Sequence, residues 1–462
     1  MERQLNTRLA AVIDEADVSH LGLASRICEV AKEWRVAPRP AHTQIARWVE
    51  GQKPRGITPA LIAEALSRKL GRRVTLAEIG MEGATTSPEA GLIFADVPSE
   101  LIENLNELMN ADLRRAEFLR GKVTASALNG PAFEWLLASP VEPPEAAGRR
   151  RIGASDVEAI RSTASMFADL DNRFGGAHAR TAAVQYLSSQ AIPLLNGTYS
   201  GPIGRALFSA VAEFSLSVAW MAYDSGWHGL GRRYSLQALA LAHQAGDRLL
   251  GASTLSALSH QANYLGEHKD AVNLARAAQH GVKGHAPALL EAQFAAMEAR
   301  AAAALGNSRS DCLNALMTAE DSFNRHREGS EPAWISYFDE AELADEFAHC
   351  FRDLGRPEES HRYANACLAA GRADDGSDEY PRSRTFSRIV LATSYLEQGE
   401  LEEACSVATA VLPRVEETAS VRCTAYLRDF HRRTRPHRDH AVVVEFTEQA
   451  RPLLEGRHLA SI

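Results

Sequence analysis

A glycine recurs near the end of each long helical stretch in the C-terminal two thirds of the chain. The glycines are Gly226, Gly266, Gly306, Gly355 and Gly399, at spacings of 40, 40, 49 and 44 residues. A helix commonly ends on a left-handed residue, and glycine adopts that conformation without steric cost. Helix pairs that repeat in this way cannot each enclose a core and must stack on one another. The pattern predicts an α-solenoid of antiparallel helix pairs over residues 153–462.

Small side chains recur at fixed distances after these glycines. Twelve residues beyond each glycine stand Ala238, Ala278, Thr318, Cys367 and Val411. Five residues beyond Gly266 and Gly399 stand Ala271 and Ala404. We expect the second helix of each pair to lie close against the first at these positions. The region resembles a tetratricopeptide-type solenoid over roughly residues 153–455, with units longer than the usual length of about 34 residues.

The first 80 residues have the pattern of a small helical domain. Apolar spacing and capping residues predict helices over 6–16, 21–34, 41–49 and 58–70, with Ser19 as the N-cap of the second and Thr58-Pro59 at the start of the fourth. Residues 81–152 contain two stretches rich in proline, glycine and serine around a helical piece near 100–119, which indicates a linker. We therefore predict an all-α protein with domains over 1–80 and 153–462, joined by the linker 81–152.

Charge separates the N-terminal domain from the rest of the chain. The whole sequence has a formal net charge of −9, but residues 1–80 contain 13 basic and 9 acidic side chains. Residues 35–73 alone contain nine basic and two acidic side chains, a net charge of +7. A basic module on an acidic body is typical of proteins that bind phosphate groups with one end of the chain.

The stretch HTQIARWVEGQKPRGITPALIAEALSRKLG resembles the lambda-repressor-like helix-turn-helix fold, the XRE group. Ile45, Trp48, Gly51 and Pro54 stand where that fold has its recognition helix, the closing glycine and the following loop, and Ile62 to Leu66 match its next helix. The resemblance covers about 70 residues and implies that the partner is double-stranded DNA.

The geometry of a helix assigns roles to the residues of this motif. Ile45 and Trp48 are three residues apart on one face and would anchor the helix in the core. The remaining positions near its start would enter the major groove, where Arg pairs with guanine and Gln with adenine, while loop cations contact phosphate. The predicted base-contacting residues are His42, Thr43, Gln44 and Arg47, and the predicted phosphate contacts are Arg39, Lys53 and Arg55.

Nearly the whole chain is similar to two groups of regulators that join a helix-turn-helix module to tetratricopeptide-like repeats. One is the peptide-sensing group of Gram-positive bacteria, and the closer is a large actinobacterial set. The stretches that carry the closer resemblance are 111–113, 133–136, 171–176, 220–224, 233–235, 237–239 and 245–247. The resemblance implies transcriptional control, often of development or specialised metabolism. We expect such a regulator to act as a homodimer, because two-fold pairing doubles its DNA contacts.

The first helix of each pair in a solenoid lines its concave surface. Polar and aromatic residues on those helices suit an extended peptide or a small-molecule effector. The predicted effector-contacting residues are Arg180, Trp220, His260, Asn263, Gln293, Arg300, Tyr337 and Glu340.

The sequence lacks the motifs of several common catalytic and metal-binding sites. Gly121-Lys122 lacks the flanking residues of a phosphate loop, and HExxH and G-x-S-x-G motifs are absent. His437 and His440 stand three apart in FHRRTRPHRDH, which we interpret as a solvated basic turn rather than a metal site. The stretch Phe174 to Arg180 fits either a structural turn or a ligand-contacting loop. We expect no enzyme activity, cofactor or metal.

The sequence also predicts the location of the protein. Its first residues are charged, and no stretch reaches 18 uncharged apolar residues, so we expect neither a signal peptide nor a membrane span. The six cysteines are scattered and are expected to be reduced in a cytoplasmic protein. We expect a DNA-binding regulator. The alternative is a non-enzymatic scaffold whose helix-turn-helix module binds a protein partner, and strong salt dependence of duplex binding would favour the regulator.

Overall fold

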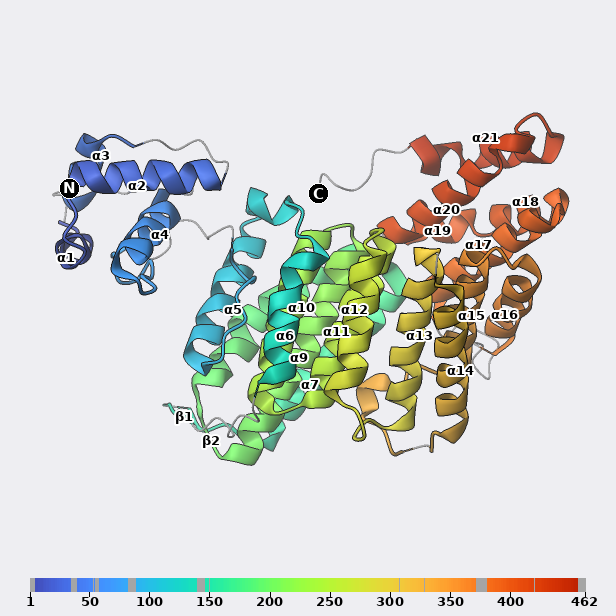
Figure 1. The fold of residues 1–462 in the computed structure, drawn as a ribbon, viewed down its shortest axis with the longest axis horizontal. Helices are drawn as coiled ribbons and strands as arrows, with labels where there is room; N and C mark the ends of the chain where they lie inside the picture. The colour runs from blue at the N-terminus through green and yellow to red at the C-terminus, as the bar shows by residue number, and fades with distance from the viewer. Residues whose placement is uncertain are drawn as a thin grey trace. The chain divides into compact units, whose positions relative to one another are not determined.

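The computed structural model describes residues 5–34, 40–52, 54, 58–81, 89–138, 146–148, 150–306, 308–327, 329–370, 380–418 and 420–455. The fold is all-α, as predicted, and forms two compact units (Figure 1). Residues 1–90 with 110–116 make up unit 1, and residues 91–109 with 117–462 make up unit 2. A short antiparallel pairing of β1 (Ala146–Ala147) with β2 (Thr198–Tyr199) accompanies the helices.

Unit 1 contains the N-terminal helices close to their predicted positions. They are α1 (Thr7–Glu15), α2 (His20–Glu33), α3 (His42–Val49) and α4 (Thr58–Leu70). The Oγ of Ser19 accepts a hydrogen bond from the Gly22 amide at 3.1 Å, which confirms the predicted N-cap of α2. Leu9, Ile27, Ile45 and Leu61 are fully buried in one apolar cluster, so helices too short to be stable alone are held by a common core.

Unit 2 is a solenoid-like stack of consecutive helix pairs. The pairs are α9 (Gly201–Asp224) with α10 (His228–Ala245), α11 (Arg248–Tyr264) with α12 (His268–Gly281), α13 (Ala288–Leu305) with α14 (Arg309–Arg325), α15 (Glu340–Asp353) with α16 (Pro357–Ala370), and α17 (Pro381–Gln398) with α18 (Leu401–Ala410). Before them come α5 (Pro98–Leu113), whose residues 110–113 belong to unit 1, α6 (Asn129–Leu137), α7 (Ala154–Phe174) and α8 (Gly176–Tyr186). After them come α19 (Leu412–Glu417), α20 (Val421–Arg433) and α21 (Ala441–Glu455).

The turn glycines have the backbone conformation that the sequence predicts. Gly226, Gly266, Gly306, Gly355 and Gly399 all have positive φ, between 66° and 85°. The second helix of the pair begins two residues after the glycine in four of these turns, and three residues after it at α14. The turn after Gly306 is therefore one residue longer than the others.

Because of that extra residue, the expectation that Thr318 packs against the first helix of its pair is wrong. Thr318 is exposed, whereas Ala319, one position later, is fully buried. The same shift applies at the position five residues after the glycine, which becomes Cys312 on α14. When the longer turn is counted, this close-packed position is small in every pair: Gly231, Ala271, Cys312, Ser360 and Ala404. The sequence pattern identified only the two alanines.

Much of the predicted linker is a packed layer of unit 2. The Gln237 side chain of α10 donates hydrogen bonds to the carbonyl oxygens of Gly91 at 3.1 Å and Ile93 at 3.0 Å. The Gln244 side chain donates to the Asp96 carbonyl at 2.7 Å. Two buried amides thus satisfy the backbone of an irregular segment, which holds it against the solenoid.

Trp135 of α6 fixes this layer to the second pair, α11 with α12. Its side chain is fully buried, and a Cβ atom added at Gly251 or Gly281 would come within 2.5 Å and 2.3 Å of the indole. The Arg248 guanidinium lies 3.9 Å from the ring centroid and donates to the Trp135 carbonyl at 2.7 Å. The two glycines therefore leave the space that the indole fills.

The last helices of unit 2 return to the first. Arg382 of α17 lies 2.8 Å from the Asp171 carboxylate of α7, and Ser420 donates a hydrogen bond to the Asp224 carboxylate of α9 at 2.8 Å. Because 196 residues separate Ser420 from Asp224, the stack curves back on itself. The stacked pairs thus enclose an interior.

Helix α9 is long and apolar enough to cross a membrane by length and composition, and among the described residues no other helix is. Its apolar window is 78% buried among the other helices of unit 2. An apolar helix that is mostly buried in this way is a core helix of unit 2.

Replacing Trp135 tests the packed layer. We expect Trp135→Ala to lower the free energy of unfolding by about 3–5 kcal/mol, because it empties a site that two glycines shape. Urea unfolding followed by circular dichroism measures the change. The matched control is Phe133→Ala on the same helix, whose side chain is 61% exposed and should cost less than about 0.5 kcal/mol. Equal losses in both variants would contradict this role of Trp135.

Candidate nucleic-acid interface and solenoid interior

Helix α3 divides into a buried and an exposed face, as predicted. Ile45 is fully buried and Trp48 is 6% exposed, both in the core of unit 1. The four predicted base-contacting residues, His42, Thr43, Gln44 and Arg47, are all exposed. The other predicted contacts, Arg39, Lys53 and Arg55, lie outside the described residues. The exposed residues occupy the first turn and a half of the helix, where a groove-reading helix has its contacts.

Gln44 already makes a hydrogen bond within the protein, whereas Arg47 makes no ion pair among the described residues. The Oε1 atom of Gln44 accepts a hydrogen bond from the Ala41 amide at 2.9 Å, which caps the start of α3. Reading an adenine through both amide atoms would break that cap. Arg47 has no ion-pair partner within the described part of the chain, so its guanidinium is available for a base or a phosphate.

Aromatic side chains from successive pairs meet inside unit 2. The ring of Trp220 on α9 lies 5.3 Å from that of His260 on α11, so two of the predicted effector contacts are neighbours. Tyr223 lies 5.8 Å from His260 and 5.4 Å from Tyr264, with edge-on geometry that favours aromatic pairs. The interior at this point is an aromatic cluster that spans two helix pairs.

Arg422 of α20 inserts into this cluster. Its guanidinium carbon lies 4.6 Å from the Tyr223 ring centroid, 5.8 Å from that of Tyr264 and 4.7 Å from that of Phe386. Its Nη1 atom is 3.9 Å from an oxygen of Asp224, and its buried Nε has no hydrogen-bond partner among the described residues. Contacts with several ring faces offset part of the cost of burying a cation.

The prediction from the sequence did not include Arg422. Helix α20 follows the last of the recurring glycines, so the repeat pattern did not assign it to the interior. A usable signal was present, because Arg422 stands at helical spacing with the inward-facing Tyr426 and Phe430. A cation on an apolar helix face requires a partner, which is the physical reason to examine such a residue.

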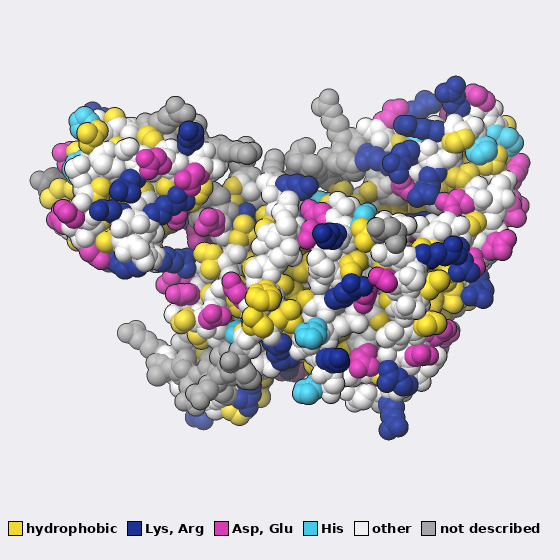
Figure 2. Space-filling view, viewed as in Figure 1, with side chains coloured by type: hydrophobic (Ala, Val, Ile, Leu, Met, Phe, Trp, Pro, Cys, Tyr) yellow, Lys and Arg dark blue, Asp and Glu magenta, His cyan; other side chains and the backbone are white. Residues whose placement is uncertain are grey.

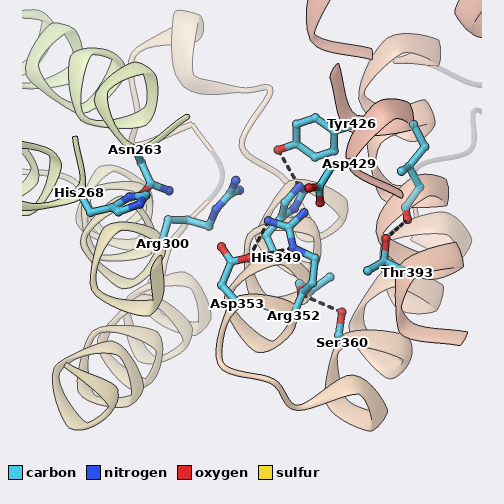
Figure 3. A network of polar contacts seen from close by, with 12 residues as sticks. Asn263, His268, Arg300, His349, Arg352, Asp353, Ser360, Thr393, Tyr426 and Asp429 are labelled. Atoms are coloured by element: carbon cyan, nitrogen blue, oxygen red, sulfur yellow. Dashed lines mark hydrogen bonds and ion pairs between the residues drawn. The ribbon is translucent and has the colours of Figure 1, made fainter. Parts of the chain in front are cut away.

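A charged face of α15 forms the opposite part of the interior. Arg300 of α13 donates to the Glu346 carboxylate at 2.5 Å, and Nε2 of His349 is 3.1 Å from the Tyr426 hydroxyl. Figure 3 shows Arg300, His349, Asp353 and Tyr426 directed toward one another from α13, α15 and α20. Ion pairs of Arg300 with Glu346, His349 with Asp345 and Arg352 with Asp353 thus lie in this part of the interior.

Gln293 and Tyr337 are also brought together. The Gln293 amide donates to the Tyr337 hydroxyl, and its buried Oε1 has no partner within the described part of the chain. Burial, and then the charges of Glu342 and Glu346, raise the pKa of Tyr337, although the side chain is 37% exposed. Burial, together with Glu346, Asp345 and Asp339, likewise raises the pKa of Glu342 well above its usual range. The Tyr337 hydroxyl thus lies beside an amide oxygen that has no partner among the described residues.

The other predicted effector contacts do not join this group. Asn263 is engaged locally, with its Oδ1 2.7 Å from Nδ1 of His268. The Arg180 guanidinium lies 5.2 Å from the Trp227 ring centroid. Glu340 is exposed in the first turn of α15. The interior therefore includes five of the eight predicted residues: Trp220, His260, Gln293, Arg300 and Tyr337.

Asp224 joins the two ends of the solenoid. Its side chain is 1% exposed, and it accepts hydrogen bonds from the Gly176 amide at 3.1 Å and from Ser420. Arg382 lies 3.4 Å from the same carboxylate and 2.8 Å from that of Asp171. A Cβ atom on Gly176 would come within 2.2 Å of the Met221 carbonyl oxygen. The Phe174 to Arg180 stretch thus contains a close-packed structural turn.

Burial changes the titration of the histidines near the cluster. Burial, followed by the charges of Arg232 and Arg422, lowers the pKa of His228 to about 4. Burial and the charges of Arg422 and Arg300 lower the pKa of His260 well below its usual range. Within the described ranges, no group of three or more His, Cys, Asp or Glu side chains is placed to hold a metal ion.

The N-terminal part of the chain is similar to a known domain family. Residues 9–82, which make up most of unit 1, match the family model of the SP15 N-terminal domain. The match covers less than a fifth of the chain. No curated protein matches the sequence.

The lowered pKa of His228 gives stability a measurable pH dependence. An unfolded histidine titrates near pH 6.5, so between that pH and about 4 the unfolded state binds more protons than the folded state. We therefore expect the free energy of unfolding to decrease as the pH is lowered through this window. The free energy of unfolding of the unaltered protein should decrease between pH 7 and pH 5, and His228→Asn should make this decrease smaller by about 1–2 kcal/mol. Urea unfolding at the two pH values measures the difference.

The exposed His437 provides the control for this experiment. The His437→Asn variant should lose as much stability between pH 7 and pH 5 as the unaltered protein. A His228→Asn variant that loses stability just as steeply would contradict a role of His228 in this pH dependence.

Proposed function

We propose that the protein is a sequence-specific DNA-binding transcriptional regulator, without enzyme activity and located in the cytoplasm. The single observation that supports this best is the division of α3, with Ile45 and Trp48 in the core and Arg47 exposed without an ion-pair partner among the described residues. A short, well-anchored helix of this kind presents its first residues to the major groove. The excess of basic residues over 35–73 supplies the attraction to phosphate.

The proposed regulator binds as a homodimer. One α3 helix contacts only a few base pairs, so a second copy is needed for a site of useful specificity. Two-fold pairing would select a pseudo-palindromic site with half-sites about one helical turn apart. Light scattering of the protein on its selected DNA measures the stoichiometry, and a tight complex with a single copy would contradict this arrangement.

We expect Arg47→Ala to weaken binding to the selected operator by about 1–3 kcal/mol and to relax base preference at one position. Selection from random duplexes identifies the site, and fluorescence anisotropy measures the affinity for operator and random duplex. Lys53→Ala is the comparison, because a phosphate contact should weaken binding to both duplexes alike. If Arg47→Ala lowers the affinity for operator and random duplex equally, Arg47 contacts phosphate and not a base. Absence of any selected duplex would favour a protein partner for unit 1.

The interior of unit 2 is the proposed effector site of the regulator. It contains the half-buried ring of Trp220 beside Tyr223, the buried cation of Arg422 over the Tyr223 ring, and the oxygen of Gln293 that is unpartnered among the described residues. Cation, acceptor and flat apolar walls together suit a short peptide or a small polar molecule. The effector would change DNA binding only by binding one arrangement of the dimer more tightly than another.

Isolation from the native host tests the effector site. We expect mass spectrometry to identify a small molecule or peptide that co-purifies with the full-length protein and is depleted in Arg422→Lys. The lysine keeps the charge but loses the planar group that stacks on three rings. The compound should raise the melting temperature and change the DNA affinity. A compound that raises the melting temperature alone would contradict the sensor role.

A further inference from the structure

A basic hollow lies at the C-terminal end of unit 2, away from the aromatic interior. It is formed by the end of α20, the 3-10 turn η6 (Arg435–His437) and one face of α21, and has a volume of about 190 Å³. Its lining includes His431, Arg435, Arg438, Val444, Glu448 and Arg451. Figure 2 shows Lys and Arg side chains gathered over this end of the unit, at the upper right.

The arginines of this region differ in their partners. Arg432 and Arg433 both pair with Asp429, and Arg433 also pairs with Glu397 at 2.7 Å. Those two arginines do not line the hollow. The cations that do line it lack such partners.

Arg435 and Arg451 have no ion pair within the described part of the chain. For Arg438, the nearest carboxylate oxygen belongs to Asp439 at 3.8 Å, and both side chains are more than 80% exposed. Such a pair contributes little, so three guanidinium groups line the hollow together with one carboxylate, that of Glu448.

Size and charge together define the ligand. A hollow of 190 Å³ holds a phosphate-sized group with a small substituent and is too small for most drug-sized molecules. Three arginines and one glutamate give a net charge of +2, which matches the charge of about −1.5 to −2 on a phosphate monoester at neutral pH. Guanidinium groups bind phosphate oxygens in pairs of parallel hydrogen bonds. Val443 and Val444 supply an apolar wall beside them.

We propose that Arg435, Arg438 and Arg451 form a binding site for a phosphate group, best suited to the dianion of a small phosphate monoester. Burial, and to a lesser extent the charge of Arg435, lowers the pKa of the adjacent His431. The inference does not rest on the proposed DNA binding by α3.

Calorimetric titration of the full-length protein with methyl phosphate tests the site. We expect saturable binding at millimolar concentration or below. Dimethyl phosphate, a monoanionic diester, should bind at least about tenfold more weakly, because it presents half the charge. A duplex without the operator provides the third arm and distinguishes a DNA backbone from a free phosphate ester as the source of the group.

Variants of the lining residues should change the affinity in opposite directions. We expect Arg435→Gln and Arg451→Gln each to weaken methyl phosphate binding about tenfold or more, and Glu448→Gln to strengthen it several-fold. The matched control is Arg432→Gln, which removes the same charge from the adjoining last turn of α20, where Arg432 pairs with Asp429 outside the hollow. It should change the affinity by less than about twofold. Arg435 and Arg451 are exposed, so thermal unfolding should confirm that all variants stay folded.

The outcomes separate a built site from diffuse attraction. No saturable binding of methyl phosphate or duplex would overturn the proposal, as would an equal loss in Arg432→Gln and Arg435→Gln. Binding of the duplex alone, lost in Arg435→Gln and retained in Arg432→Gln, would support the phosphate site and assign it to nucleic acid. Operator binding that fails in Arg47→Ala and persists in Arg435→Gln would separate this site from α3.

Discussion

The closed form of unit 2 depends on one buried carboxylate. Asp224 is 1% exposed, and a charge removed from water in this way must be matched by donors. Those donors come from both ends of the stack: the Gly176 amide before α9, and Ser420, Arg382 and Arg422 from its last helices. An open arrangement would remove Ser420, Arg382 and Arg422 and leave Asp224 with only the Gly176 amide. The aromatic cluster around Arg422 exists because the same contacts bring α20 against α9 and α11.

The sequence predicted the helices and turns well because those features depend on near neighbours. The helices of unit 1 lie within one or two residues of their predicted bounds, and all five turn glycines are left-handed. Residues that act through spacing were found for the same reason, including Ile45 and Trp48. The misplacement of Thr318 also has a local cause, since one additional residue in the turn after Gly306 moves the buried position to Ala319. Counting from the helix start rather than from the glycine would have found it.

The interior was predicted only in part because its contacts join distant segments. Trp220 and His260 belong to consecutive pairs, so the repeat itself placed them on a common surface. Arg422 meets Tyr223 only because the stack closes, and no periodic pattern encodes that closure. The same limit explains the linker prediction. The linker prediction missed the burial of Trp135 against Gly251 and Gly281, because this is a tertiary fit that composition does not reveal.

The arginines of this protein show why partners, more than the number of charges, indicate function. Arg300, Arg382 and Arg422 are largely buried, and carboxylates or aromatic rings already compensate them, so removing them would chiefly disturb the fold. Arg47 and Arg435 are exposed and have no carboxylate partner among the described residues. An arginine of the second kind gives up only water when it binds phosphate, whereas one of the first kind must also break an existing pair. Phosphate binding is therefore proposed on α3 and beside α21, while the proposed effector of the solenoid interior would have to insert among charges that are already paired.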